Sequence, residues 1–258
     1  MTLIFTMKTQ EALFNYCLRL ADTSLILAQR NAEWCGHGPF LEEDLALTNI
    51  SLDLLGQANL ILLYAGTVEG KGRSEDDLAF HRTEREYYNT LLSEQSNGDY
   101  AKTILRQFLC DAFDFYFYSE LVKSKDETLS AISAKSIKEI TYHLRHSSSW
   151  VERLGDGTEE SHTRMQNALD ELWRFTEEMF EMNEVDSVLI KEGIAVDLKS
   201  IQPKWESKVK EILERATLKI PANAFMQRGS RDAKHTEHLG FILAEMQSLP
   251  RSLPDAKW

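Results

Sequence analysis

Proline is almost absent from most of the chain, since only Pro39 occurs before Pro203. Because proline interrupts helices, a long stretch without it can run as uninterrupted helix. Within this stretch apolar residues recur at helical spacing, as at Leu13, Cys17 and Leu20. Such residues share one face of an α-helix, whereas a half-buried strand would alternate apolar and polar positions. The pattern therefore predicts an all-α protein.

Turn-forming residues divide this region into six predicted helices. They cover residues 10–34, 41–65, 77–95, 100–124, 128–154 and 159–181. The second and fourth of them are apolar on nearly all sides, which is typical of helices in the middle of a bundle. Four long helices with shorter ones around them predict a ferritin-like helical bundle.

The chain changes in composition after residue 185. Gly193, Pro203, Pro221 and Gly229 interrupt this part, and only residues 204–216 and 236–249 are predicted as helices. No internal repeat or low-complexity segment marks a second domain. We therefore predict one ferritin-like domain over residues 1–258, with the core bundle at about 10–180 and a C-terminal extension at about 185–258 that wraps on the bundle.

The charge and the cysteines restrict partners and location. A net charge of −12 disfavours nucleic acid or an anionic membrane as the main partner. Cys17, Cys35 and Cys110 are far apart and form no CxxC pair, which favours a reducing compartment. No apolar run approaches the roughly 18 residues of a membrane span. The predicted location is the cytoplasm, without a membrane or nucleic-acid partner.

A helical bundle with carboxylates in apolar helices raises the question of a di-iron site. Such a site needs a Glu from each of two helices and Glu-x-x-His from each of two others. One Glu-x-x-His occurs, Glu159 with His162, and it lies in the first turn of a predicted helix, where a solvated end is the better interpretation. The predicted helix 41–65 contains no histidine.

The other candidate is the stretch KEITYHLRHSSSW at residues 138–150. His143 and His146 follow Glu139 by about one and two helical turns. Glu139 and one of these histidines could hold a metal, but no second helix supplies nitrogen for a second ion. The alternative, that both histidines are hydrogen-bonded within the bundle or at an interface, is favoured.

Several carboxylates stand in or beside apolar helical stretches: Asp22, Asp53, Asp111, Asp114 and Glu139. Buried carboxylates are costly unless they are paired or bind a metal. Lys135, one turn before Glu139, could supply the positive charge that a metal would otherwise provide. We hypothesise an internal network of ion pairs and hydrogen bonds, although Asp22 and Asp114 also abut polar residues and can equally be exposed.

Long blocks of the chain resemble the C subunits of bacterial phenylacetyl-CoA epoxidases, which are multicomponent monooxygenases. The blocks are NYCLRLADTSLILAQRNAEWCGHGPFLEEDLALTNISLDLLGQA, SNGDYAKTILRQFLCDA, AISAKSIKEITYHLRHSSSWVERLGDGTEES, LWRFTEEMFE and HTEHLGFILAEMQSLPRSLPDAKW. They span nearly the whole chain, so the resemblance is far more specific than a short motif would be.

This resemblance implies a ferritin-like bundle that supports a catalytic relative. In that family the di-iron centre lies in the A subunit, which also binds the CoA thioester. The C subunit shares its fold but lacks a functional iron site, a small B subunit bridges the assembly, and a reductase with FAD and an iron-sulfur centre passes electrons from NADPH. The complex adds one oxygen atom of O2 to the aromatic ring of phenylacetyl-CoA. The implied role of this chain is that of a non-catalytic structural subunit without a cofactor of its own.

The resemblance also suggests where a lost metal site would lie. The two Glu-x-x-His pairs of the catalytic relative would fall on Asp53-x-x-Gly56 and Glu139-x-x-Tyr142. In each pair an acid remains and the histidine is gone, with Lys135 as a replacement charge. We assign no catalytic, cofactor-binding or metal-binding residue to this chain.

The sequence offers two kinds of surface for partners. The aromatic-rich helix 100–124 and the residues Phe80, Tyr87 and Tyr88 could form an apolar face, although core packing is the simpler interpretation for each of them. Arg228, Arg231 and Lys234 form a basic island that could meet an acidic partner or a CoA phosphate, or lie in a solvated loop.

Two other functions stay open at this point. One is an autonomous di-metal carboxylate oxidase or oxygenase with atypical ligands, and the other is a helical binding module unrelated to oxygenation. Self-association is open as well. Iron content distinguishes a di-metal oxidase or oxygenase from a structural subunit. Association with a di-iron partner distinguishes a structural subunit from an unrelated binding module.

Overall fold

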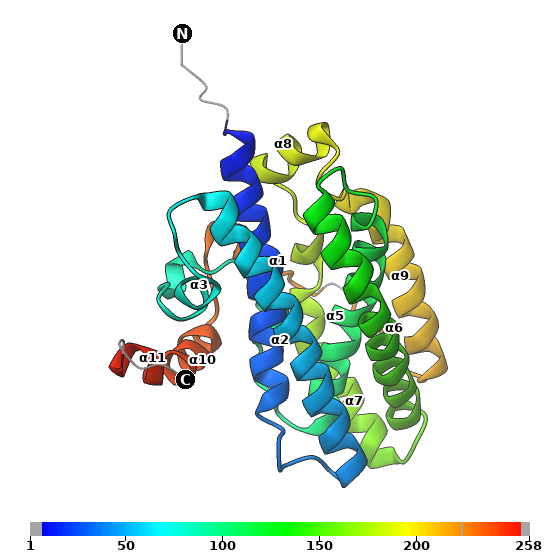
Figure 1. The fold of residues 1–258 in the computed structure, drawn as a ribbon. Helices are drawn as coiled ribbons and strands as arrows, with labels where there is room; N and C mark the ends of the chain where they lie inside the picture. The colour runs from blue at the N-terminus through cyan, green and yellow to red at the C-terminus, as the bar shows by residue number, and fades with distance from the viewer. Residues whose placement is uncertain (1–6, 223, 254–258) are drawn as a thin grey trace.

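Four long helices build the body of the molecule in the computed structural model, which describes residues 7–222 and 224–253. They are α1 (Thr9–Ala32), α2 (Leu41–Glu69), α5 (Tyr100–Leu121) and α6 (Glu127–Gly155). Helix α2 lies along α1, α6 lies along α5, and α2 also contacts α6 (Figure 1). The described residues contain no strand, so the predicted all-α, ferritin-like helical bundle is confirmed.

Local capping explains several of the boundaries of these helices. The side chains of Asp99 and Asp126 accept hydrogen bonds from main-chain N–H groups in the first turns of α5 and α6, which satisfies donors that a helix start leaves free. Helix α2 ends at Gly70, which adopts φ 71°, a conformation that costs glycine little. Local sequence thus sets the starts of α5 and α6 and the end of α2, and all four helices lie close to the predicted limits.

The shorter elements surround the bundle. Before α5 lie α3 (Glu75–Phe80), η1 (Glu84–Glu86) and α4 (Leu91–Glu94); after α6 come α7 (Glu159–Leu172), η2 (Trp173–Phe175), η3 (Glu177–Phe180), α8 (Glu184–Glu192), α9 (Leu198–Arg215), η4 (Ser230–Asp232), α10 (Glu237–Met246) and α11 (Ser248–Ser252). The single helices predicted at 77–95 and 159–181 are therefore wrong in detail. The first is three short pieces, and the second becomes 3₁₀ helix after Leu172.

The extension contains more helix than the sequence predicted. Helix α8 was missed, although Asn183 and Asp186 form a capping box at its start. Helix α9 begins at Leu198, after its cap Asp197, and includes Pro203 in its second turn. The predicted start after Pro203 was too late, because proline near a helix start removes few intrahelical hydrogen bonds.

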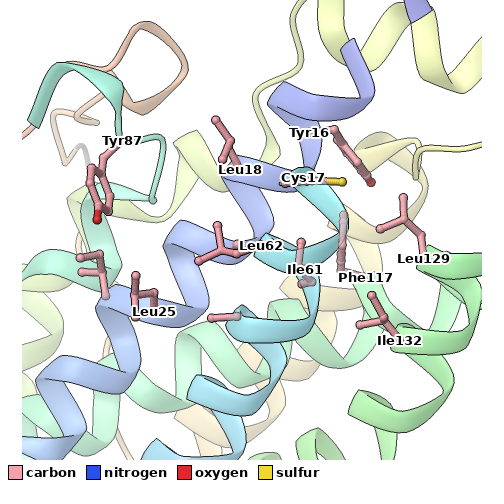
Figure 2. Packing of buried hydrophobic residues seen from close by; sticks show 14 of the residues in the cluster. Tyr16, Cys17, Leu18, Leu25, Ile61, Leu62, Tyr87, Phe117, Leu129 and Ile132 are labelled. Atoms are coloured by element: carbon pink, nitrogen blue, oxygen red, sulfur yellow. The ribbon is translucent and has the colours of Figure 1, made fainter. Parts of the chain in front are cut away.

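Two apolar clusters fill the bundle, one toward each end. In the first, Tyr16 and Cys17 of α1 point toward Phe117 of α5, and Leu129 and Ile132 of α6 lie beside them (Figure 2). The second is lined by α2, α5, α6, α7 and α9. The extension contacts the bundle through α8 and α10 on α1 and through α9 on α5 and α6. That the whole chain is one domain stays a prediction.

Candidate functional site

The residues predicted to mark a lost metal site lie where α2 and α6 meet. Partial burial and the nearby charge of Asp53 raise the pKa of Glu139, while the charge of Lys135 acts in the opposite direction. The structure thus brings the two acids together. Lys135 is exposed, and among the described residues it forms no ion pair with Glu139.

Gly56 and Tyr142, which stand where the catalytic relative would have its histidines, face outward. Nothing lies within 4 Å of a Cβ atom built on Gly56, and Tyr142 is 41 % exposed. The Tyr142 ring stacks on His146 at 6.1 Å between ring centroids. The interpretation of Asp53, Gly56, Glu139 and Tyr142 as remnants of a metal site stays a prediction, at positions near the surface of the bundle.

Both histidines of α6 are hydrogen-bonded to carboxylates within the bundle. His143 Nε2 lies 3.0 Å from Asp53 Oδ2. Burial lowers the pKa of His143, although the hydrogen bond to Asp53 acts in the opposite direction, so at neutral pH the ring is neutral and Nε2–H donates to the carboxylate. His146 Nε2 lies 2.7 Å from Glu43 Oε2. These contacts occupy Nε2 of each ring, while the two Nδ1 atoms are buried and have no hydrogen-bond partner among the described residues.

Glu43, in the first turn of α2, is a site residue that the sequence analysis did not single out. Its Oε2 accepts a second hydrogen bond, at 2.5 Å, from the Tyr100 hydroxyl. Tyr100 in turn packs edge-on against Trp34 and Trp150. Glu43 therefore joins α2, α5 and α6 at one end of the bundle. No local pattern marks a pair separated by 103 positions.

Asp111 lies in the centre of the bundle and is hydrogen-bonded by neutral groups. Its two oxygens accept from Gln107 Nε2 at 2.6 Å and from Ser147 Oγ at 2.7 Å. Asn31 extends this chain by donating to Gln107. Burial raises the pKa of Asp111 well above its ordinary value, against the effect of these hydrogen bonds. The predicted network therefore exists here as hydrogen bonds without an ion pair.

Asp22 is fully buried, which corrects the expectation that it can be exposed. Both its oxygens accept from the terminal nitrogens of Arg82, and Oδ2 also accepts from the main-chain N–H of Tyr88. The Arg82 guanidinium lies 4.2 Å from the centre of the Tyr87 ring. A buried arginine pairs with this acid, and it comes from the irregular segment after α3.

Asp114 faces a cavity of about 50 Å³ between α1 and α5. Arg19, Asp186 and Arg231 also line this cavity, and Arg19 pairs with Asp186 at 2.9 Å. Among the described residues no hydrogen bond or ion pair reaches Asp114. Removal from water raises its pKa from the ordinary 3.8 to about 7. Asp114 is therefore half-buried and faces a cavity, which corrects the expectation that it can be exposed.

Replacing Asp114 by asparagine is expected to stabilise the fold at alkaline pH. The folded state holds the Asp114 proton more tightly than the unfolded chain, so this group removes stability as pH rises from 3.8 to about 7. Asp114→Asn should gain about 2–4 kcal/mol over wild type above pH 7 and little near pH 4. Urea unfolding across this range checks it. Asp156→Asn, at an exposed position, is the control, and parallel curves for Asp114→Asn and wild type would refute the assignment.

The residues that the sequence offered as partner surfaces make contacts within the chain. Tyr87 is fully buried, and Phe80, Tyr88 and most of α5 pack into the core. In the basic island, Arg228 pairs with Glu177 and Glu181, and Lys234 with Asp232. Arg231 instead faces the cavity beside α1. The apolar candidates are thus largely taken up by core packing, whereas Arg228 and Lys234 stay exposed and their contact with a partner stays a prediction.

A row of exposed apolar side chains lies on α2. Five leucines on one side of this helix are each 41–69 % exposed: Leu41, Leu45, Leu52, Leu55 and Leu63. Neighbouring leucines in this set are three or four residues or about two helical turns apart, so they lie along one side of the helix as a single stripe. Gly56 lies in the same stripe. By length and composition α2 is also the one described helix that could span a membrane, with half of its most apolar window buried in the bundle.

Replacing Gly56 by alanine is expected to stabilise the isolated chain. Gly56 lies inside α2, and an added Cβ would meet no neighbour within 4 Å. Alanine reduces the backbone entropy lost on folding, so the gain should be about 0.5–1 kcal/mol. Thermal or urea unfolding measures it. A loss of stability would mean that a neighbouring group occupies the space beside Gly56.

The donor groups of this chain do not fit a carboxylate-bridged di-iron centre. In the part of the chain that the structure describes, no three His, Cys, Asp or Glu side chains converge as metal ligands. The Glu-x-x-His pair of α7 is not part of such a group either, because His162 Nδ1 is hydrogen-bonded to the Gly155 carbonyl oxygen at 2.6 Å. A di-iron centre requires histidine nitrogens from two helices, so we assign no step to a metal in this chain.

The comparisons with known proteins agree with the resemblance. A family model described as phenylacetic acid catabolic protein matches residues 4–258. The chain is 51 % identical over 243 residues to the C subunit of the 1,2-phenylacetyl-CoA epoxidase of Escherichia coli (strain K12). The match covers 94 % of this chain and 98 % of that relative. This chain therefore belongs to the phenylacetic acid catabolic protein family.

Proposed function

We propose that this chain is a non-catalytic structural subunit of a phenylacetyl-CoA epoxidase and acts in phenylacetate breakdown. Its relative from Escherichia coli is named as the C subunit of that enzyme. The family match over nearly the whole chain supports a role in the same catabolism. The chemistry, epoxidation of the aromatic ring with O2 and electrons from NADPH, then takes place in a partner A subunit with a di-iron centre.

The leucine stripe of α2 is the observation that carries this proposal. A monomeric protein rarely leaves a row of large apolar side chains in water, and such faces are typical of protein interfaces. The apolar stripe suits a helix of the A subunit, since two helices can interlock along residues three and four apart. Gly56, with open space beside it, lets a partner approach the backbone closely.

The same helix is a poor membrane anchor. Its first turn carries Glu42, Glu43 and Asp44, and these charges are repelled by an anionic lipid surface. The net charge of −12 adds to this effect. We therefore propose a location in the cytoplasm, with the A subunit on the stripe and the B subunit and the reductase with FAD and iron-sulfur as further components.

The internal carboxylates fit a supporting role. Asp22 is neutralised by Arg82, Asp111 is held by neutral groups, and Glu43 and Asp53 are hydrogen-bonded to histidines. Each acid thereby stabilises the packing of helices against one another. Hydrogen-bond networks of this kind make the helices that they join more rigid, and a rigid surface is what a supporting protein provides to its partner.

Assembly with the A subunit tests the proposal. The full chain and the corresponding A subunit are purified separately, mixed at micromolar concentration and examined by size-exclusion chromatography with light scattering. We expect one mixed species with a mass above that of either protein, and the chain alone reveals any self-association. Separate elution of the two proteins at these concentrations would contradict the proposed role.

A further inference from the structure

The C-terminal arm, formed by α10 and α11, is fastened to the rest of the molecule at a buried histidine. His235, just before α10, and Glu94 of α4 have fully buried side chains, with His235 Nδ1 2.9 Å from Glu94 Oε2. The other ring nitrogen, Nε2, lies 2.9 Å from the carbonyl oxygen of Tyr87. Both ring nitrogens therefore face oxygen atoms inside the protein.

The neighbouring groups fix the number of protons on this pair. The Tyr87 carbonyl can only accept, so His235 Nε2 carries a hydrogen. Glu94 already accepts from Asn89 Nδ2 and from both the main-chain N–H and the hydroxyl of Thr236. A carboxyl surrounded by donors is held in its ionised form, so Nδ1 carries a hydrogen as well. His235 is then an imidazolium.

The charges around the pair agree with this assignment. Burial acts to lower the pKa of His235, but the hydrogen bond and charge of Glu94 outweigh it and raise the pKa above its ordinary value. The Tyr87 carbonyl and the charge of Asp22 on α1 act in the same direction. Two arginines lie near this region: Arg82 is paired with Asp22, and Arg30 of α1 is paired with Glu33 while it donates to the main-chain carbonyl oxygen of Glu94.

The arm is also attached by apolar contacts, since Leu239, Ile242 and Leu243 of α10 pack into the first apolar cluster. Its other polar contacts lie on the same side. Gln247 Nε2 donates to the Arg82 carbonyl at 3.0 Å, and Arg251 donates to the carbonyls of Phe80 and Arg82. These acceptors belong to the last residue of α3, Phe80, and to Arg82 in the segment that follows it. The charged pair is thus the strongest polar contact between the arm and the bundle, because hydrogen bonds between charged groups exceed those between neutral ones.

We propose that the His235–Glu94 pair is a proton-dependent clasp, which holds the C-terminal arm on the bundle while His235 carries two protons and loosens the arm when one is lost. With Nδ1 deprotonated, its lone pair would face a carboxylate oxygen at hydrogen-bond distance, which is repulsive. The contribution of the clasp is complete below the unfolded-state pKa of about 6.5 and is lost as pH rises through the raised folded value. This inference does not depend on the proposed function.

Two measurements on the full chain test the clasp. In histidine-selective 15N NMR, we expect one ring to carry protons on both nitrogens at neutral pH and to lose one above it, and that signal should disappear in His235→Gln. In hydrogen exchange, corrected for the intrinsic effect of pH, the amides of α10 should exchange about 10- to 100-fold faster near pH 9 than near pH 6. The amides of α5 provide the internal reference.

Matched variants separate the clasp from a general loss of stability. Glu94→Gln should leave α10 exchanging rapidly at every pH, without the pH dependence. His238→Gln, on the same arm and without a hydrogen-bonded ring among the described residues, should keep the wild-type profile. A His235 ring that is singly protonated at pH 6 would overturn the proposal, and so would an α10 whose exchange relative to α5 is unaffected by pH.

Discussion

Replacing Leu52 and Leu55 together by glutamate is expected to abolish assembly with the A subunit. Both side chains are exposed in the isolated chain and lie in the middle of the α2 stripe. In an interface they would be buried, and two carboxylates without partners there would be strongly unfavourable. Burial of each carboxylate without a partner should cost at least about 1.4 kcal/mol, so the affinity should fall at least ~100-fold. Isothermal titration calorimetry or biolayer interferometry measures the change.

A matched variant controls for charge and exposure. Phe241 and Leu249 are also exposed apolar side chains, but they lie on the C-terminal arm. Their replacement by two glutamates adds the same charge and should leave the affinity for the A subunit within about threefold of wild type. Both variants should unfold at nearly the wild-type urea concentration. Equal losses of affinity in the two variants would show that α2 is not the interface.

Replacing Arg82 by methionine is expected to cause one of the largest losses of stability available to a single substitution. Arg82 neutralises Asp22, which is fully buried, and it also donates to the carbonyl oxygen of Glu86 at 2.8 Å. Removal of one partner leaves a buried charge without compensation, which costs about 3–5 kcal/mol. The free energy of unfolding in urea measures this loss. It should be accompanied by faster hydrogen exchange in residues 75–95.

The double variant Arg82→Met, Asp22→Asn distinguishes loss of the ion pair from loss of packing. If the uncompensated charge dominates, removal of the Asp22 charge should restore part of the stability, and the two substitutions should be clearly non-additive. The exposed pair Arg164 and Glu160 serves as a reference, because Arg164→Met should cost no more than about 1 kcal/mol. A similarly small cost for Arg82→Met would contradict the assigned role.

The long helices could be predicted from the sequence because their signals are local. Periodic apolar residues and a near absence of proline give α1, α2, α5 and α6 to within a few residues. The segment 77–95 could not be predicted, since its chain direction depends on Arg82 reaching Asp22, sixty positions away. Helix α8 had a local signal in Asn183 and Asp186, but the glycines and prolines of the extension made this signal hard to recognise.

The candidate site was predicted in part. Asp53 and Glu139 were expected to lie near each other, and the structure places them so. The partners of the acids were not predicted: Glu43 with His146 and Asp22 with Arg82 join segments that pack only in the folded chain. Likewise, α2 was expected to be buried on nearly all sides. Its composition cannot reveal that one apolar face is left without a neighbour in the described chain.

Iron content per chain tests the central claim most directly. The chain is purified, loaded anaerobically with Fe(II) and analysed alone and after mixing with the A subunit. We expect the isolated chain to stay free of iron, while the mixed complex takes up about two irons per A subunit, as a di-iron centre requires. If the isolated chain instead binds about two irons and reduces O2, it is a di-metal oxidase or oxygenase with atypical ligands, and the structural role is wrong.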